Sequence, residues 1–267
     1  MNLVLLGHTW RSQRLKLAIV AIGLAAWGFL LPVIYSQFGV EFKQLFESGV
    51  IPKQFAQFGQ GDVFTLPGSI ALGFIHPIAI ILTSVFAVGF AAGSIAGERQ
   101  RGTLEVLLAR PLSRRQIHAT LFVAVLLFIA ISMAAILAGN LVGATVFGVI
   151  DELDVARVPL VWLDGVLLYA ALASIGLAAS ASFDRLSPAL GITIGFTIVS
   201  YFLEVLGSLW PDASVLQPYS LFHYLRPNDL LSGTFDPFGP ALLLAVAIAG
   251  IAWASFVFPR RDLAAPS

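Results

Sequence analysis

The chain has 267 residues, of which 58% are hydrophobic and only 11% are charged, and its formal net charge is zero. An ordinary soluble domain carries about 25% charged residues to cover its core, so this composition excludes one. The charge balance provides no basic face for a nucleic acid. The absence of cysteine excludes disulfides, zinc–thiolate sites and cysteine nucleophiles.

Six apolar stretches are long enough to cross a bilayer. A helix rising about 1.5 Å per residue needs about 20 apolar residues to span a hydrocarbon core of about 30 Å. We therefore predict an all-α integral membrane protein, embedded in lipid as a single transmembrane domain over residues 1–267. The six predicted spans cover residues 15–38, 68–96, 117–141, 160–183, 188–209 and 238–258. The third stretch stays apolar to Ile150, which we interpret as a helical extension or an interfacial turn.

The N-terminal segment 2–13 has its own pattern. Leu3, Leu6 and Trp10 recur at helical spacing beside basic residues, which predicts an interfacial helix on the inner leaflet. Basic residues before an apolar run are also typical of a secretory signal. No small-x-small cleavage site follows, so a retained first span is favoured.

The second predicted span contains two unusual features. His76 precedes Pro77, and a proline removes a helical hydrogen bond and kinks the helix. Further along, Gly89, Gly93 and Gly97 repeat every four residues. Small residues at this spacing let helix backbones approach closely, so we predict helix packing there, with a dimer seam as one place for it. Gly191 and Gly195 form a similar pair on the fifth span.

The segment 97–116 between the second and third spans predicts a short amphipathic helix. Gly102 ends the preceding helix, and Thr103 can cap a new one. The new helix has an acidic first turn, an apolar stripe and a proline stop, provided by Glu105, Leu104, Leu107, Leu108 and Pro111. Ser113 and Gln116 predict a capping box for the third span. Such a helix suits docking in a groove of a partner protein, or resting on lipid.

Three of the polar side chains within the predicted spans are candidates for a translocation path. They are His76, Asn140 and Glu204. A polar residue inside the membrane is a functional hypothesis by default. The alternative for His76 and Asn140 is an internal hydrogen bond. For Glu204, near the outer end of the fifth span, the alternative is snorkelling to the interface.

The last outer segment, 210–237, is cut by prolines. Its aromatic stretch Tyr219–Leu225 predicts a short re-entrant or interfacial helix.

Charge sets the orientation of the whole chain. With a cytoplasmic N-terminus, eleven of the 15 lysine and arginine residues fall inside, and Lys43, Lys53, Arg157 and Arg226 fall outside. The positive-inside rule then predicts that both termini are cytoplasmic. The outer segments are acidic, either for lack of selection for basic residues or as an exit vestibule that favours cations.

The pattern Glu98-x3-Gly102-Thr103-Leu104-Glu105-x2-Leu108-Ala109-x-Pro111 resembles the signature of type-2 ABC exporter permeases. The segments 225–230 and 258–262 are similar to stretches of that family too. The resemblance implies a coupling helix, formed by Glu98, Gly102, Thr103, Leu104, Glu105, Leu107, Leu108 and Pro111, that meets a separate ATPase subunit. It also implies a second permease, either another copy of this chain or a similar permease, a cell-membrane location and export. Members often place an acidic residue in the first interfacial helix, where this chain has His8, Thr9 and Trp10.

The chain contains no Gly-x4-Gly-Lys-[Ser/Thr] motif, so it has no loop to cradle ATP phosphates. We expect a transport subunit without catalytic, cofactor or metal residues of its own, with ATP and magnesium bound by the partner. An intramembrane protease would need a Gly-x-Ser-x-Gly or His-Glu-x-x-His motif, and neither is present. An ion-coupled secondary transporter remains the alternative, although only Glu204 provides a carboxylate deep in a span and no inverted repeat is visible.

Overall fold

The computed structural model describes residues 1–49, 61–105, 109 and 112–261, and all of its regular elements within these ranges are helices. Five of them are long and apolar enough to cross a membrane. They are α1 (Leu3–Glu47), α7 (Arg114–Val146), α8 (Val158–Ser182), α9 (Leu186–Leu209) and α11 (Phe238–Arg260). A bent helix pair between α1 and α7 gives a sixth crossing if it counts as one span. The predicted all-α membrane fold is confirmed.

The second span is the bent pair. Helix α2 (Leu66–Ile75) is followed at Pro77 by α3 (Pro77–Ser84), and the helix axis turns by 47° at this break. His76 has extended backbone, with φ −68° and ψ 140°, because a proline disfavours helical geometry at the residue before it. The predicted kink is therefore confirmed. A π-helical turn, η2 (Val85–Phe90), interrupts the span a second time before α4 (Ala91–Gly93), which the sequence pattern did not predict.

The N-terminal residues do not form a separate helix. The segment predicted to be an interfacial helix provides the first turns of α1, which runs on without interruption into the first span. The backbone N–H of Asn2 donates to Thr120 Oγ1 of α7 at 2.8 Å, and the Trp10 ring stacks on Phe128 at 6.0 Å. The start of α1 is therefore packed on the bundle through α7.

Helices α1 and α7 cross at a seam of glycines, Gly28 on α1 with Gly139 and Gly143 on α7. A Cβ atom added to Gly139 would lie 2.0 Å from the carbonyl oxygen of Ala25, and one on Gly28 would lie 2.1 Å from that of Ile136. No side chain fits there, so the two backbones are in direct contact. Helix α7 continues past Leu141 to Val146, which confirms the predicted helical extension of the third span.

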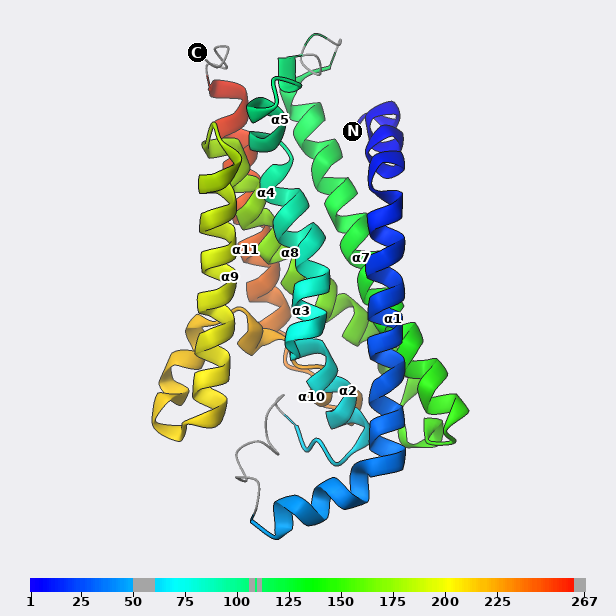
Figure 1. Cartoon of the computed structure of the whole chain (residues 1–267). Coiled ribbons are helices and arrows are strands. Elements are labelled where there is room, and N and C mark those ends of the chain that lie inside the picture. Colours follow the sequence, from blue (N-terminus) through cyan, green and yellow to red (C-terminus); the bar gives the residue numbers. More distant parts are fainter. Residues whose placement is uncertain (50–60, 106–108, 110–111, 262–267) are drawn as a thin grey trace.

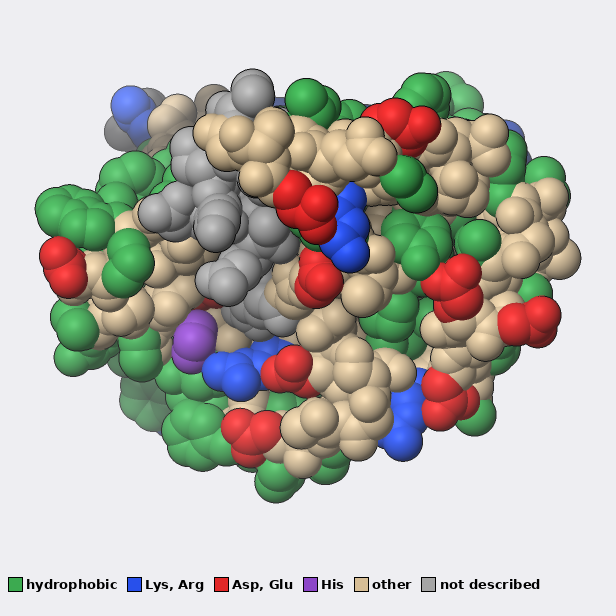
Figure 2. Space-filling model, turned by 90° about the horizontal axis from the view of Figure 1, so that it is seen from below, with side chains coloured by type: hydrophobic (Ala, Val, Ile, Leu, Met, Phe, Trp, Pro, Cys, Tyr) green, Lys and Arg blue, Asp and Glu red, His purple; other side chains and the backbone are tan. Residues whose placement is uncertain are grey.

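Both chain termini lie at one end of the bundle, called here the termini end, and the opposite end is called the far end (Figure 1). Short helical turns cover the far end: η3 (Ile150–Glu152), η4 (Val155–Arg157), η5 (Pro211–Tyr219), η6 (Phe222–Tyr224) and α10 (Pro227–Ser232). The predicted re-entrant helix at Tyr219–Leu225 is the single turn η6. Acidic side chains are spread over the far end (Figure 2).

Candidate functional site

The segment after the second span begins with a tight bend at the termini end. Helix α5 (Ala96–Gln100) ends before Gly102, whose φ of +71° suits glycine. The hydroxyl of Thr103 donates to the main-chain oxygen of Glu98 at 3.1 Å and also to its carboxylate, which pairs with Arg101. Glu98, Gly102 and Thr103 therefore form one closed turn that sets the direction of the segment.

Leu104 and Glu105 point in opposite directions. Leu104 is only 3% exposed and packs in a cluster at the termini end that includes Ile95, Ile117 and Phe258. Glu105 is exposed, and its carbonyl accepts the N–H of Ala109 at 2.8 Å. Leu104 thus anchors the segment within the chain instead of facing a partner. Leu107, Leu108 and Pro111 lie outside the described residues.

Asp184, between α8 and α9, connects this segment to the C-terminal end of α11. Arg99 and Arg261 both form ion pairs with its carboxylate. Arg261 also donates to the carbonyl of Ala181 at 3.0 Å, while its own carbonyl accepts from Arg114 at 2.8 Å. These contacts connect four helices, α5, α7, α8 and α11, at the termini end. Sequence reasoning missed Asp184, whose only signal was an acid beside a single arginine in a three-residue loop.

Ser180 of α8 fixes the break between α4 and α5. Its hydroxyl oxygen accepts the backbone N–H groups of Ile95 and Ala96, each at 3.0 Å, and the serine is fully buried. Gln100 then accepts the N–H of Leu186, the first residue of α9, at 2.9 Å. These bonds satisfy donors at two helix starts. The segment is therefore held to α8 and α9 by hydrogen bonds as well as by charge.

A groove of about 690 Å³ opens beside the bend, between the first turns of α1, the second span and α9. Its walls are partly apolar, with Phe90 and Leu190, and partly basic, with Lys16 and Arg101. Two of the predicted packing glycines, Gly89 and Gly93, line this groove, and the nearest atoms to an added Cβ are 3.8 Å and 3.7 Å away.

The remaining predicted packing glycines make no tight contact between helices of the chain. An added Cβ on Gly97 would have Arg101 as its nearest neighbour at 3.5 Å, and Gly191 and Gly195 have nothing within 4 Å. Close packing within the chain occurs instead at the α1–α7 seam. Packing of the predicted glycines at a dimer seam stays a prediction.

The three predicted path residues lie apart, and none of them lines the groove. His76 caps α3 by accepting the N–H of Ile78 at 3.3 Å, and its ring lies 4.5 Å from that of Trp27. Asn140 is 1% exposed, and its amide makes no hydrogen bond to the described residues. Glu204 is 2% exposed, so neighbouring parts of the chain cover its side chain.

Glu204 belongs to a polar chain at the far end. Its carboxylate accepts from Gln217 at 3.2 Å and lies 3.4 Å from His223 Nδ1. Arg226 lies 3.3 Å from the other ring nitrogen of His223 and 3.6 Å from the carboxylate of Asp229. Because an arginine can only donate, its contact with His223 requires an acceptor at Nε2, and Nδ1 is then the ring nitrogen that faces Glu204.

Comparison with known proteins places these features in a family. Residues 24–263 match a family model described as ABC-2 family transporter protein. The chain is also similar to YhcI of Bacillus subtilis (strain 168), described as an uncharacterized protein, with 28% identity over 208 residues. That similarity covers 69% of this chain and 66% of YhcI, slightly less than two thirds of the relative. The chain therefore belongs to the ABC-2 family of transporter proteins, as a multi-pass membrane permease of the ABC transporter class.

Proposed function

We propose that this chain is the permease subunit of an ATP-driven exporter, in which a separate subunit binds ATP and magnesium and hydrolyses the nucleotide. The observation that carries the proposal is the arrangement around Asp184. The bend at Gly102 places Glu105 on the surface, and the ion pairs of Arg99 and Arg261 tie the same segment to α8, α9 and α11.

A force on this segment reaches the membrane helices through short polar contacts. A displacement of α5 pulls on Ser180 and on the start of α9, because its hydrogen bonds end there. The second span can absorb such a displacement at two places, the 47° break before Pro77 and the π-helical turn η2. Rearrangement in the ATPase would thus rock the helices between inward-open and outward-open states.

The proposed assembly contains a second permease copy in the cell membrane, with both termini in the cytoplasm. Much of α9 is exposed, with apolar side chains such as Phe196 and Val199 beside Gly191 and Gly195. This face is the proposed seam between copies. The positive-inside distribution supports the orientation, because Arg99, Arg114 and Arg261 gather at the termini end.

A second candidate function, ion-coupled transport, is favoured by one observation. Glu204 is buried and contacts His223, which in turn contacts Arg226. Chains of ionisable residues within a membrane protein are typical of proton relays. In this alternative the gradient of an ion would replace ATP, and Glu204 would carry the coupling.

The proposed function is tested by purification of the tagged chain from its native host in mild detergent. We expect a near-stoichiometric subunit with a Walker A motif to co-purify. Glu105→Arg, which reverses a charge on the exposed side of the segment, should release that subunit. Glu41→Arg makes the same change at an exposed position of α1 at the far end and should retain it.

If the chain purifies alone, even after cross-linking, the ATP-driven proposal is wrong. The ion-coupled alternative is then tested by Glu204→Gln in proteoliposomes under an imposed proton gradient. Retention of gradient-driven uptake in that variant would exclude Glu204 as the coupling residue. If the ATPase subunit co-purifies with both Glu105→Arg and Glu41→Arg, its docking surface lies outside this segment.

A further inference from the structure

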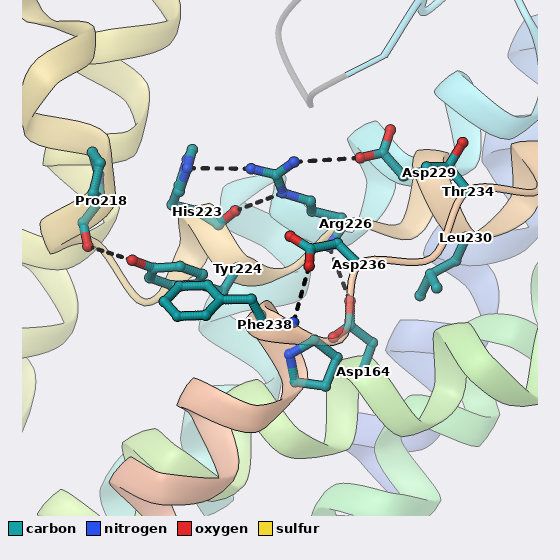
Figure 3. A pocket seen from close by; sticks show the side chains of 12 residues that line it. Asp164, Pro218, His223, Tyr224, Arg226, Asp229, Leu230, Thr234, Asp236 and Phe238 are labelled. Atoms are coloured by element: carbon teal, nitrogen blue, oxygen red, sulfur yellow. Dashed lines mark hydrogen bonds and ion pairs between the residues drawn. The ribbon is translucent and has the colours of Figure 1, made fainter.

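A second cavity, of about 220 Å³, lies at the far end of the bundle. It is enclosed by the start of α8, by η6 and α10, and by the start of α11 (Figure 3). One liquid water occupies about 30 Å³, so the cavity has room for a small organic molecule. The groove at the termini end is a separate feature, because the two share no lining residue.

The charges around this cavity are unbalanced. Three carboxylates, Asp164, Asp229 and Asp236, surround a single guanidinium, Arg226 (Figure 3). The Nη1 atom of Arg226 lies 3.6 Å from Asp229 Oδ2, so these two charges offset each other. The ion pairs of the described residues include none for Asp164 or Asp236. The cavity is therefore net acidic.

Asp164 is the residue that points to a ligand. It is 3% exposed and lines the cavity. Its Oδ2 atom accepts the backbone N–H of Arg226 at 2.9 Å, but its Oδ1 atom is buried without a hydrogen-bond partner in the described part of the chain. A buried carboxylate oxygen without a donor is costly. A cation that also carries an N–H or O–H group would balance the charge and donate the missing hydrogen bond.

The surroundings favour an organic cation over a metal ion. No group of three histidine, aspartate or glutamate side chains in the described ranges is placed to hold a metal. Two aromatic rings, Tyr224 and Phe238, lie 5.9 Å apart in the wall of the cavity. Aromatic faces beside a carboxylate are typical of sites that bind alkylated ammonium groups through cation–π contacts.

We propose that this cavity binds a small organic ammonium ion at the far end of the bundle. The carboxylate of Asp164 pairs with the cation, and the rings of Tyr224 and Phe238 cover its alkyl groups. Asp236, exposed at the rim, adds negative charge that attracts the ion. The described residues of the segment 98–112 do not line this cavity.

The test uses the full chain in nanodiscs and measures equilibrium binding of radiolabelled choline. We expect saturable binding that its uncharged carbon analogue, dimethylbutanol, does not displace. Asp164→Asn keeps the acceptor for Arg226 but removes the charge, and should weaken choline binding about tenfold or more. Asp212→Asn, an exposed acid of the far end outside the cavity, should change the affinity less than about twofold.

A second pair of variants decides the question if Asp164→Asn fails to fold. Phe238→Leu removes a ring from the cavity and should weaken binding about threefold or more. Phe235→Leu removes an exposed ring that does not line it, and should have no effect. The proposal is overturned if wild type shows no saturable choline binding, if dimethylbutanol competes equally, or if the folded Asp164→Asn or Phe238→Leu protein binds like wild type.

Discussion

Gly139→Ala tests the close contact between α1 and α7. The new methyl carbon would lie 2.0 Å from the carbonyl oxygen of Ala25 and 2.8 Å from the backbone nitrogen of Phe29. Real Cβ atoms essentially never come within 3.0 Å of other atoms, so the helices must separate by about 1 Å. Overpacking of this kind costs about 1–3 kcal/mol. At about 2–4 °C per kcal/mol for a chain of this size, the midpoint of thermal unfolding in detergent should fall by about 5 °C.

Gly7→Ala is the matched control, since it makes the same change near the start of α1, away from the crossing with α7. Nothing lies within 4 Å of the new methyl carbon there. Alanine is a better helix former than glycine by about 0.5–1 kcal/mol, so this variant should be as stable as wild type or slightly more stable. Fluorescence-detected size-exclusion chromatography after heating measures both. Equal midpoints of thermal unfolding for the two variants would refute the close contact between α1 and α7.

Two further variants test the connections proposed for the transporter. Asp184→Asn removes the ion pairs to Arg99 and Arg261. Because the carboxylate is 56% exposed, the free energy of unfolding should fall by less than about 1 kcal/mol. The amount of substrate transported per ATP hydrolysed in proteoliposomes should fall at least about twofold. An unchanged ratio would exclude Asp184 from the coupling path. Gly195→Cys in this cysteine-free chain should give a disulfide-linked dimer in membranes if α9 forms the interface between two copies. Leu163→Cys, which is exposed on α8, should not give such a dimer. Equal cross-linking of the two variants would contradict an interface at α9.

The sequence predicted the fold well, because the signals for membrane helices and their breaks are local. The kink at Pro77, the bend at Gly102 and the capping box of Ser113 and Gln116 are all found in the structure. Each depends on one or two residues whose backbone chemistry determines the outcome.

Positions that depend on tertiary contacts were predicted less well. Four-residue spacing identified Gly191 and Gly195 as a face of small residues, but spacing does not show what covers that face. Among the described residues, no atom lies within 4 Å of a Cβ added at either position. The Gly139–Gly143 pair has the same spacing and makes the close crossing. Leu104 was predicted to face a partner, yet its neighbours from α7 and α11 bury it. Such contacts come from residues far away in the sequence.

Two groups of polar residues lie at opposite ends of the bundle, and each fits one of the two tasks proposed for this membrane domain. At the termini end, Asp184 and Ser180 join several helices to one exposed segment, which suits the transmission of movement. At the far end, Asp164 keeps a carboxylate oxygen without a partner beside a cavity, which suits recognition of a cation. Binding at one end can influence movement at the other only through the helices between them. If choline changes the affinity of the complex for ATP by some factor, ATP must by reciprocity change the affinity for choline by the same factor.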